Sequence, residues 1–578
     1  MKTLLVAINT KFIHTNLAIR YLRNVALEKG IPVEMAEYTI NHRMEEILQG
    51  IYLQKPEILC FSCYLWNISL VRKLSVELKK VLPDLKIWCG GPEVTYHADT
   101  FLQENPAVDL VMQGEGEGIF PALLLALEQN RSFSEVKGIT YRWKGEILAT
   151  EPAPPFDLKD LPFAYHDLEQ LSHKIVYFES SRGCPFSCSY CLSSVTRGVR
   201  KMPVELACQY LDRFIDRKVP QVKFVDRTFN CDKKHADAIL RHLIEHDNGI
   251  TNFHFEISAD LLGDSTLELI RSARQGLFQF EVGVQSTNPQ TLAAIHRSAS
   301  TETVFAKADL VRQTNKAHVH EDLIAGLPLE DYDSFAHSYD EVFAHHPDML
   351  QLGFLKVLKG STMEADCEKY GIVYQSEPPY EVLRTNWLSF DEIIRLKHID
   401  TLNDGYLNSG RFRRSLDYIL RPEKFPSPFR FFEQLAQWFT DHNLWEGSAG
   451  KFDYYLWLYD FYKAHFGEEE TLLWIFRHDI LARENIRTFP EIFGQSLYPA
   501  YKNEIDRFFA TPECIETYLP AFQGESPQRI ARAARLEVFP FSPLTGEEVP
   551  TAILYDYSRR DFNGNAWHWD VSEVCFAK

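Results

Sequence analysis

The chain has 578 residues, of which 45% are hydrophobic and 24% charged, a composition typical of a globular protein with about three to four domains. Its formal net charge of −19 argues against broad, non-specific binding of nucleic acid. No apolar run reaches the roughly 18 residues of a membrane span, and the N-terminal apolar run is too short for a signal peptide. The 11 unevenly spaced cysteines favour a reducing cytoplasm and a metal cluster over a disulfide framework.

Residues 1–135 show alternating strand and helix patterns. Short apolar runs predict buried parallel strands at residues 4–8, 33–38, 58–63, 86–89 and 109–113, with helices near 16–27, 66–81 and 119–130. This alternation predicts an α/β domain with a Rossmann-like sheet, which binds ligands at the carboxyl ends of its strands. Those ends carry Ser62, Gly90-Gly91 and Gly114-Glu115-Gly116-Glu117, whose glycines let a ligand approach the backbone closely.

A hairpin and a proline-rich connector are expected over residues 136–172. The hairpin has strand-like runs on either side of the Lys144-Gly145 turn, and four prolines lie between residues 151 and 162. Such a connector is stiff and extended, which suits two ligand sites that must face each other.

Three cysteines, Cys184, Cys188 and Cys191, follow the next strand-like run at spacings of four and three. Three thiolates cannot complete a structural zinc site without a fourth ligand, and no further Cys or His lies nearby in the sequence. They can hold three irons of a 4Fe–4S cluster and leave the fourth iron open to a ligand. The alternative is three unrelated buried cysteines.

Residues 173–365 repeat the strand–helix alternation. Strands are expected at residues 175–179, 221–226, 252–257, 279–285, 317–324 and 349–354, with helices such as 204–217, 232–246, 264–275 and 301–314 between them. Six such units predict an open, partial (β/α)6 barrel, whose active groups belong at the carboxyl ends of its strands.

The CxxxCxxC segment resembles that of the radical S-adenosylmethionine (SAM) enzymes, and the glycine loops resemble the cobalamin-binding domain that precedes many radical SAM cores. Glu281–Ser286 is similar to the family's fourth-strand motif and Gly326-Leu327-Pro328 to its fifth-strand motif. The resemblance implies a 4Fe–4S cluster, SAM and cobalamin as cofactors. It also implies these SAM-binding residues: Tyr190, Asp226, Arg227, Glu256, Gln285, Ser286, Asp322, Gly326 and Pro328. The usual Gly-Gly-Glu is absent, and Glu256 stands where relatives often carry arginine.

The resemblance to cobalamin-binding domains departs from the common pattern after the first strand, where the Asp-x-His-x-x-Gly loop is missing. His14 is present without that aspartate and glycine, so the resemblance is to the subgroup that binds cobalamin without a histidine on cobalt, and residues Tyr64 to Asn67 are expected near the lower cobalt face. The implied cobalamin-binding residues are His14, Ser62, Tyr64, Trp66, Asn67, Gly90, Gly91, Glu93, Gly114, Glu115, Gly116 and Glu117. A flavodoxin-like sheet without a ligand is the alternative.

Residues 366–578 predict a mainly α-helical C-terminal domain with a tail strand at 552–557. It resembles an extension found in one bacterial subgroup of these proteins, whose role is unknown. The aromatic stretch 452–459 is a candidate stacking surface, although aromatics at helical spacing favour a core. Cys367, Cys514 and Cys575 lack ligand spacing, which argues against a second cluster.

The resemblance implies reductive cleavage of SAM to a 5′-deoxyadenosyl radical and, with cobalamin, methylation of an unactivated carbon. An external one-electron reductant of the flavodoxin or ferredoxin type is the expected partner, and the substrate is open. The alternatives are a cobalamin-assisted rearrangement or cyclisation without methyl transfer, a tRNA-modifying radical SAM enzyme, and a non-catalytic cobalamin sensor. The tRNA-modifying class normally carries a further N-terminal cysteine triad and a small basic C-terminal domain, whereas here Cys60, Cys63 and Cys89 lie at strand ends and the C-terminal region is long and aromatic. Cys60-x-x-Cys63 is not expected to be a redox pair, because strand alternation points the two side chains to opposite faces.

Overall fold

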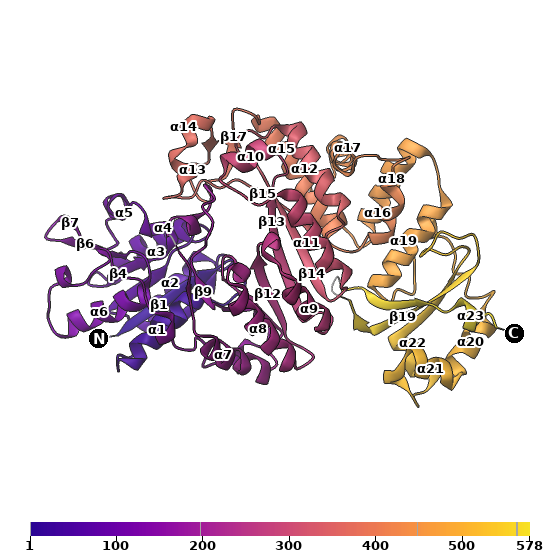
Figure 1. Cartoon of the computed structure of the whole chain (residues 1–578), viewed down its shortest axis with the longest axis horizontal. Helices are drawn as coiled ribbons and strands as arrows, with labels where there is room; N and C mark the ends of the chain where they lie inside the picture. Colours follow the sequence, from indigo (N-terminus) through magenta and orange to yellow (C-terminus); the bar gives the residue numbers. More distant parts are fainter. Residues whose placement is uncertain (1, 197, 448, 562–563, 578) are drawn as a thin grey trace. The chain divides into compact units, whose positions relative to one another are not determined.

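Two structural units make up the chain in the computed structural model, which describes residues 2–196, 198–447, 449–561 and 564–577. Unit 1 contains Met1–Asp331 and Gly353–Phe390, and unit 2 contains Tyr332–Leu352 and Asp391–Lys578. In Figure 1 the indigo-to-magenta elements belong to unit 1 and most of the orange and yellow elements to unit 2. Among the described helices, none combines the length and the apolar character that a membrane crossing needs.

The first sheet of unit 1 has the strand order β2-β1-β3-β4-β5-β6-β7. Its strands are β1 (Thr3–Asn9), β2 (Glu34–Thr39), β3 (Ile58–Ser62), β4 (Lys86–Gly90), β5 (Leu110–Met112), β6 (Ile139–Trp143) and β7 (Glu146–Ala149). Its helices are α1 (Leu17–Glu28), α2 (Met44–Gln54), α3 (Ile68–Val81), α4 (Pro92–Thr95), α5 (Ala98–Glu104) and α6 (Gly116–Glu128). Strands β1 to β5 run parallel, as predicted, and the hairpin β6–β7 continues this sheet by antiparallel pairing with β5.

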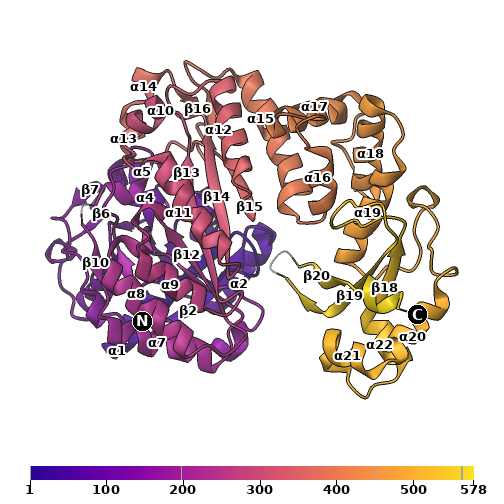
Figure 2. The same ribbon diagram turned by 45° about the vertical axis from the view of Figure 1, so that its right-hand side comes forward.

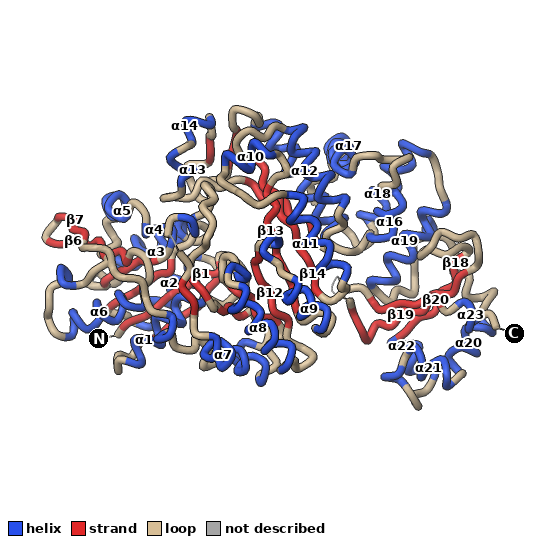
Figure 3. The backbone as a smooth tube through the Cα atoms, viewed as in Figure 1, coloured by secondary structure: helices blue, strands red, loops and turns tan. Residues whose placement is uncertain are grey.

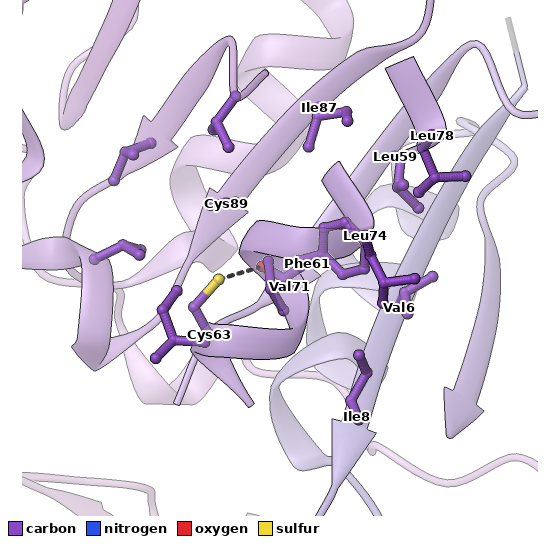
Figure 4. Close-up of a cluster of buried hydrophobic side chains, with 14 of the residues drawn as sticks. Val6, Ile8, Leu59, Phe61, Cys63, Val71, Leu74, Leu78, Ile87 and Cys89 are labelled. Carbon is purple, nitrogen blue, oxygen red and sulfur yellow. Dashed lines mark hydrogen bonds between the residues drawn. The ribbon is translucent and has the colours of Figure 1, made fainter. Parts of the chain in front are cut away.

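Both faces of this sheet are buried, because helices cover each of them. One hydrophobic cluster contains Cys63 and Cys89, and a separate cluster contains Cys60. Figure 4 shows Cys63 and Cys89 among the side chains that pack beneath α3, where the Cys63 thiol lies 3.7 Å from the Phe61 carbonyl oxygen. The two cysteines of the Cys60-x-x-Cys63 pair therefore belong to different cores and do not form a redox pair.

The second sheet of unit 1 is parallel through β8, β11, β12, β13 and β14. Its strands are β8 (Val176–Phe178), β11 (Gln221–Phe224), β12 (Asn252–Ile257), β13 (Phe278–Gln285) and β14 (Ala317–Ala325), and its helices are α7 (Val204–Asp216), α8 (Lys233–Glu245), α9 (Asp264–Ser272), α10 (Pro289–Ala294) and α11 (Thr301–Gln313). The sixth predicted strand is present as β15 (Met349–Phe354), and just beyond it the Leu355 N–H donates to the Ala325 carbonyl. Figure 2 shows α7, α8 and α9 along the near side of this sheet.

Buried and half-buried residues alternate strictly along β13, so apolar and polar side chains lie on opposite faces of this strand. Phe278, Phe280, Val282 and Val284 are buried, whereas the intervening Gln279, Glu281, Gly283 and Gln285 are half-buried. Because successive side chains of a strand point to opposite faces, the aromatic and aliphatic set packs against the helices and the polar set lies on the barrel's inner side. The same strand thus supplies both a core and a polar site.

The rest of unit 1 includes a short hairpin, β9 (Ser181–Arg182) with β10 (Arg200–Lys201), that encloses the cysteine motif. It also contains α13 (Thr362–Ala365), α14 (Cys367–Tyr370), β16 (Val373–Tyr374) and β17 (Val382–Arg384).

Unit 2 is mainly helical, as predicted, but it also holds a three-stranded antiparallel sheet where the sequence predicted one tail strand (Figure 3). Its helices are α12 (Tyr332–Ala344), α15 (Phe390–Leu402), a π-helix (Asn403–Asn408), α16 (Arg413–Ile419), α17 (Pro428–Asp441), α18 (Asp453–Phe466), α19 (Glu470–Arg483), α20 (Lys502–Ala510), α21 (Pro512–Tyr518), α22 (Pro527–Ala533) and α23 (Ser572–Cys575), and its strands are β18 (Ala534–Phe539), β19 (Thr551–Arg560) and β20 (Ala566–Asp570). Tyr455 and Tyr459 of the aromatic stretch are buried core residues.

Candidate functional site

The three motif cysteines line one pocket of about 210 Å³ at the carboxyl ends of the second sheet's strands. Cys188 is buried, and burial raises the pKa of its thiol. The Cys184 sulfur lies 3.3 Å from the Thr228 hydroxyl, and the Cys191 N–H donates to the Cys188 carbonyl at 3.1 Å. Three thiols on the wall of one pocket match the donor set that a 4Fe–4S cluster with an open iron requires.

Three carboxyl groups also line this pocket: Glu256 on β12, Glu281 on β13 and Asp322 on β14. Burial raises the pKa of Asp322 well above its ordinary value, and the neighbouring Glu281 and Glu256 charges add to the shift. Burial likewise raises the pKa of Glu256. One Asp322 oxygen, Oδ1, is buried without a hydrogen-bond partner, so the pocket has acceptor capacity left for a ligand.

Glu281 is the carboxylate that stays charged. Burial raises its pKa, but hydrogen bonds from His254 and Lys223 outweigh burial and bring the pKa down to about 2. The distances from Glu281 Oε2 are 3.1 Å to His254 Nε2 and 3.2 Å to Lys223 Nζ. The charged Glu281 therefore lies between a polar layer of the barrel interior and the thiol pocket.

Gln285 ends β13 in a left-handed conformation with φ of +74°, next to a bulge in the pairing with β14. Such a φ is uncommon for a residue other than glycine and marks a strained position. It turns the Gln285 side chain over Gly283, where a Cβ would collide with its amide nitrogen. Arg297, which sequence reasoning missed, also lines the pocket and donates to the Gly283 carbonyl.

The predicted SAM-binding residues divide into two groups. Tyr190, Arg227, Glu256, Gln285 and Asp322 line the thiol pocket. The other four, Asp226, Ser286, Gly326 and Pro328, are buried outside its lining. Asp226 accepts hydrogen bonds from the Ser180 N–H, the Ser180 hydroxyl and the Ser181 hydroxyl, and Ser286 donates to Glu330 at 2.6 Å. Contact of these four residues with SAM stays a prediction.

A second pocket, of about 350 Å³, lies at the carboxyl edge of the first sheet. Eight predicted cobalamin residues line it: Ser62, Tyr64, Gly90, Gly91, Gly114, Glu115, Gly116 and Glu117. Gly91 has a φ of +115°, and a Cβ there would lie 2.5 Å from the Cys63 carbonyl oxygen, whereas a Cβ on Gly114 would project into open space. The glycine edge is therefore both tightly folded and open toward a ligand, as a bulky flat cofactor requires.

A larger cavity of about 610 Å³ shares walls with both pockets. It shares Tyr64, Glu115, Glu117 and Arg182 with the glycine-edge pocket, and Arg227 with the thiol pocket. The rings of Tyr64 and Trp66 stack in this cavity, with their centroids 4.4 Å apart and an angle of 5° between their planes. The large cavity is therefore adjacent both to the edge of the first sheet and to the thiol pocket.

His14 also lines the large cavity, where its Nδ1 lies 2.7 Å from the Tyr177 hydroxyl. Burial lowers the pKa of His14, and the nearby Lys11 and Lys223 charges lower it further. Asn67 and Glu93 are buried in other roles. Asn67 donates to the Ile8 and Ser62 carbonyls, and Glu93 accepts from Lys359 at 2.9 Å and from the Tyr380 hydroxyl.

Arg182, two residues before Cys184, is the most heavily paired charge near these cavities, and sequence reasoning did not single it out. Its Nη2 lies 2.5 Å from Glu117 and 2.6 Å from Glu179, and its Nη1 lies 3.4 Å from Glu115. The Gly-Glu-Gly-Glu loop of the first sheet therefore faces the cysteine segment through ion pairs as well as lining a pocket.

Known families account for most of the chain. The B12 binding domain family matches residues 3–124, the Radical SAM superfamily matches residues 178–342, and a protein family of unknown function (DUF4080) matches residues 368–554. These matches confirm the predicted order of a cobalamin-binding domain before a radical SAM core, and with it the predicted cofactors.

Individual relatives are distant, and the similarity covers only part of each. TokK of Streptomyces tokunonensis, named a cobalamin-dependent radical SAM methyltransferase, is 25% identical over 436 residues, which are 69% of this chain and 63% of TokK. An anaerobic magnesium-protoporphyrin IX monomethyl ester cyclase of Synechocystis sp. is 29% identical over 256 residues, or 43% of this chain and 51% of the cyclase. The chain therefore spans less than two thirds of either relative.

Among solved structures, the cobalamin-dependent S-adenosylmethionine radical enzyme OxsB, with aqua-cobalamin and S-adenosylmethionine bound, aligns with a TM-score of 0.58 at 15% identity, covering 91% of this chain and 84% of OxsB. At this identity the likeness shows the fold. The domain matches give this chain an N-terminal B12 binding domain, a Radical SAM superfamily domain whose three motif thiols lie in one pocket, and a C-terminal DUF4080 domain, in that order.

Proposed function

We propose that this protein is a cobalamin-dependent radical SAM enzyme that cleaves SAM reductively to a 5′-deoxyadenosyl radical and methylates an unactivated carbon of its substrate. The observation that carries the proposal is the shared lining of the thiol pocket, the large cavity and the glycine-edge pocket. When bound, the cluster supplies an electron, SAM a radical and a methyl group, and cobalamin a carrier for that methyl group.

In this proposal the chain's own residues position the reactants. Cys184, Cys188 and Cys191 hold the cluster, and Glu256 and Asp322 accept hydrogen bonds from the ammonium group of SAM. Arg227 lines both the thiol pocket and the large cavity and therefore lies between SAM and the substrate. Its Nη1 is 3.9 Å from Glu256, a loose pair that leaves the guanidinium available to a ligand.

The glycine edge would hold cobalamin, with no histidine of this chain as its ligand. His14 lines the large cavity but not the glycine-edge pocket, and its Nδ1 lies 2.7 Å from the Tyr177 hydroxyl. The stacked Tyr64 and Trp66 rings, with the Trp66 N–H donating to the Ile8 carbonyl at 3.0 Å, offer a rigid flat surface that a flat cofactor would contact. The name of TokK supports methyl transfer.

One alternative has specific support. The Synechocystis relative is named a cyclase, so a cobalamin-assisted cyclisation or rearrangement without methyl transfer is the second candidate. A tRNA-modifying enzyme and a non-catalytic cobalamin sensor remain as further alternatives. In every catalytic version a flavodoxin- or ferredoxin-like donor supplies the electron.

Cofactor analysis tests the proposal. The chain is purified and reconstituted under anaerobic conditions, and iron, sulfide and cobalamin are quantified; about four irons and about one cobalamin per chain are expected. Incubation with methyl-labelled SAM, a reductant and a cell extract of small molecules should then move the label into a product. Label recovered only in methionine and uncleaved SAM, with 5′-deoxyadenosine formed, points to rearrangement. An intact cluster that forms no 5′-deoxyadenosine points to a sensor. Absence of bound cobalamin after reconstitution overturns the assignment of the first domain.

A further inference from the structure

The cysteine motif lies in a loop whose two ends are held together by the β9–β10 hairpin. Arg182 and Arg200 are directly opposite each other in this antiparallel pair. The segment from Gly183 to Val199, which includes all three cysteines, therefore begins and ends at an arginine. Two like charges side by side on a hairpin are unfavourable unless anions neutralise them.

Both arginines bind the same carboxylate of the first domain. Arg200 donates to Glu115 through both terminal nitrogens, and Arg182 Nη1 lies 3.4 Å from Glu115 Oε2. Glu115 also accepts from the Phe156 N–H at 2.7 Å, and Arg200 donates to the Phe156 carbonyl at 2.7 Å. We call the five charged residues of this network, Arg182, Arg200, Glu115, Glu117 and Glu179, the clasp.

Burial makes the clasp sensitive to its surroundings. The side chains of Arg182, Glu117 and Glu179 are only 15%, 8% and 9% exposed. Burial raises the pKa of Glu115, but Arg200 and Arg182 outweigh burial and lower it. Buried charges depend strongly on good pairing, so a small displacement of either side is resisted.

The clasp is also a wall of the ligand cavities. Glu115, Glu117 and Arg182 line both the glycine-edge pocket and the large cavity. A bulky ligand bound there replaces water against these side chains, and ion pairs strengthen when water is removed from them. The ligand thus acts on the same residues that hold the cysteine loop.

We propose that the clasp couples the two cofactor sites: cobalamin binding at the glycine edge tightens the hairpin around the cysteine loop and thereby changes the reduction potential and the SAM affinity of the cluster. Arg182, Arg200 and Glu115 are positioning residues in this scheme, because they act through the loop. Coupling between two binding sites is reciprocal, so SAM changes the affinity for cobalamin by the same factor. This inference rests on the proposed two-cofactor function.

The test compares Arg200→Gln with Lys201→Gln in the full-length, cluster-reconstituted chain. The side chain of Arg200 is 33% exposed, so its loss weakens the clasp without stranding the more deeply buried Arg182. Lys201 is its neighbour on the same strand but pairs with Asp232 outside the clasp, which makes it the matched control. Hydroxocobalamin is the probe, and the readouts are an EPR-monitored redox titration of the cluster, SAM binding, and hydrogen exchange of peptides from the cysteine loop.

In the wild type and in Lys201→Gln, hydroxocobalamin should shift the cluster midpoint potential, slow exchange in the cysteine loop and change SAM affinity about fivefold or more. In Arg200→Gln both cofactors should still bind, but these responses should shrink severalfold. Equal responses in both variants, or cobalamin binding to the wild type without any response, overturn the clasp proposal alone. If the chain holds its cluster but never binds hydroxocobalamin, the clasp proposal and the proposed function are both overturned.

Discussion

At the scale of single residues, the glycines of the first sheet differ in what they do. Gly91 combines a φ of +115° with a backbone oxygen, that of Cys63, only 2.5 Å from where a Cβ would lie. Gly145 in the β6–β7 turn has a φ of +88° with nothing near its missing Cβ. Position 91 therefore requires glycine both because of its backbone conformation and because a Cβ has no room there. Position 145 requires glycine only because of its backbone conformation.

We predict that Gly91→Ala destabilises the protein clearly more than Gly145→Ala. A positive φ costs an alanine about 1–2 kcal/mol at Gly145. Gly91, at φ 115° and ψ 172°, lies in a region essentially restricted to glycine, and overpacking against the Cys63 carbonyl adds about 1–3 kcal/mol in Gly91→Ala. Urea denaturation of both full-length variants, followed by the fluorescence transition of the first domain, measures the difference. Equal destabilisation would show that the β4–α4 turn relaxes freely around the added methyl group.

At the scale of elements, helix α16 depends on a carboxyl group from another helix. Asp479 of α19 is buried and accepts hydrogen bonds from the Arg414 N–H at 3.2 Å, the Ser415 N–H at 2.9 Å and the Ser415 hydroxyl at 2.5 Å. These donors belong to the first turn of α16, where N–H groups have no partner within the helix. Burial raises the pKa of Asp479 to about 7.

This pKa predicts that the contribution of Asp479 to the stability of the folded protein falls as the pH rises. Because the folded pKa lies above the unfolded one, the native state holds the proton more tightly; the contribution is full below the unfolded pKa and is lost as pH rises to about 7. The loss is at most about 1.4 kcal/mol per pH unit. Asp479→Asn removes this titration, so its melting temperature relative to wild type should rise between about pH 5 and about pH 8.

The comparison variant is Asp417→Asn on α16, because the Asp417 charge contributes to the raised pKa of Asp479. Its melting temperature relative to wild type should rise less over the same pH range than that of Asp479→Asn. A level profile for Asp479→Asn would show that the three hydrogen bonds keep Asp479 ionised in the folded protein.

At the scale of the whole molecule, both predicted cofactor sites belong to unit 1, yet their ligand residues come from separate sheets. The cysteines follow β8 of the second sheet, and the glycine loops follow β4 and β5 of the first. Loading of one site should therefore not be required for folding of the other.

Replacement of one cluster ligand tests this independence. Cys188→Ala should lose most of its iron and all SAM cleavage, because two thiolates do not retain a stable cluster, while cobalamin binding persists within a fewfold of wild type. Cys208→Ala, which changes a half-buried cysteine of α7, should keep both cofactors. Iron analysis and a cobalamin absorbance titration measure the two outcomes; simultaneous loss of both cofactors in Cys188→Ala would show that the sheets fold as one cooperative body.

The sequence predicted those features whose signals are local. Continuous apolar runs predicted β1 to β5, and the spacing of Cys184, Cys188 and Cys191 predicted that the three thiols share one site. Both signals lie within a short stretch of sequence and do not depend on distant residues. The three-stranded sheet of unit 2 was missed beyond its tail strand because antiparallel partners such as Leu536 and Leu554 lie far apart in sequence. Arg297 and Arg182 were missed for the same reason. An arginine acquires its role from its partners, and Glu117 lies 65 residues before Arg182.

The clasp has a practical consequence for dissecting this protein. A shortened chain that begins after the proline-rich connector would keep Arg182, Arg200 and Glu179 but lose Glu115 and Glu117, so the hairpin around the cysteines would keep only one of the three carboxylates of the clasp. The boundary that the linker suggests is therefore a poor place to cut. In a chimera with another first domain, that domain would need glutamates at the positions equivalent to Glu115 and Glu117.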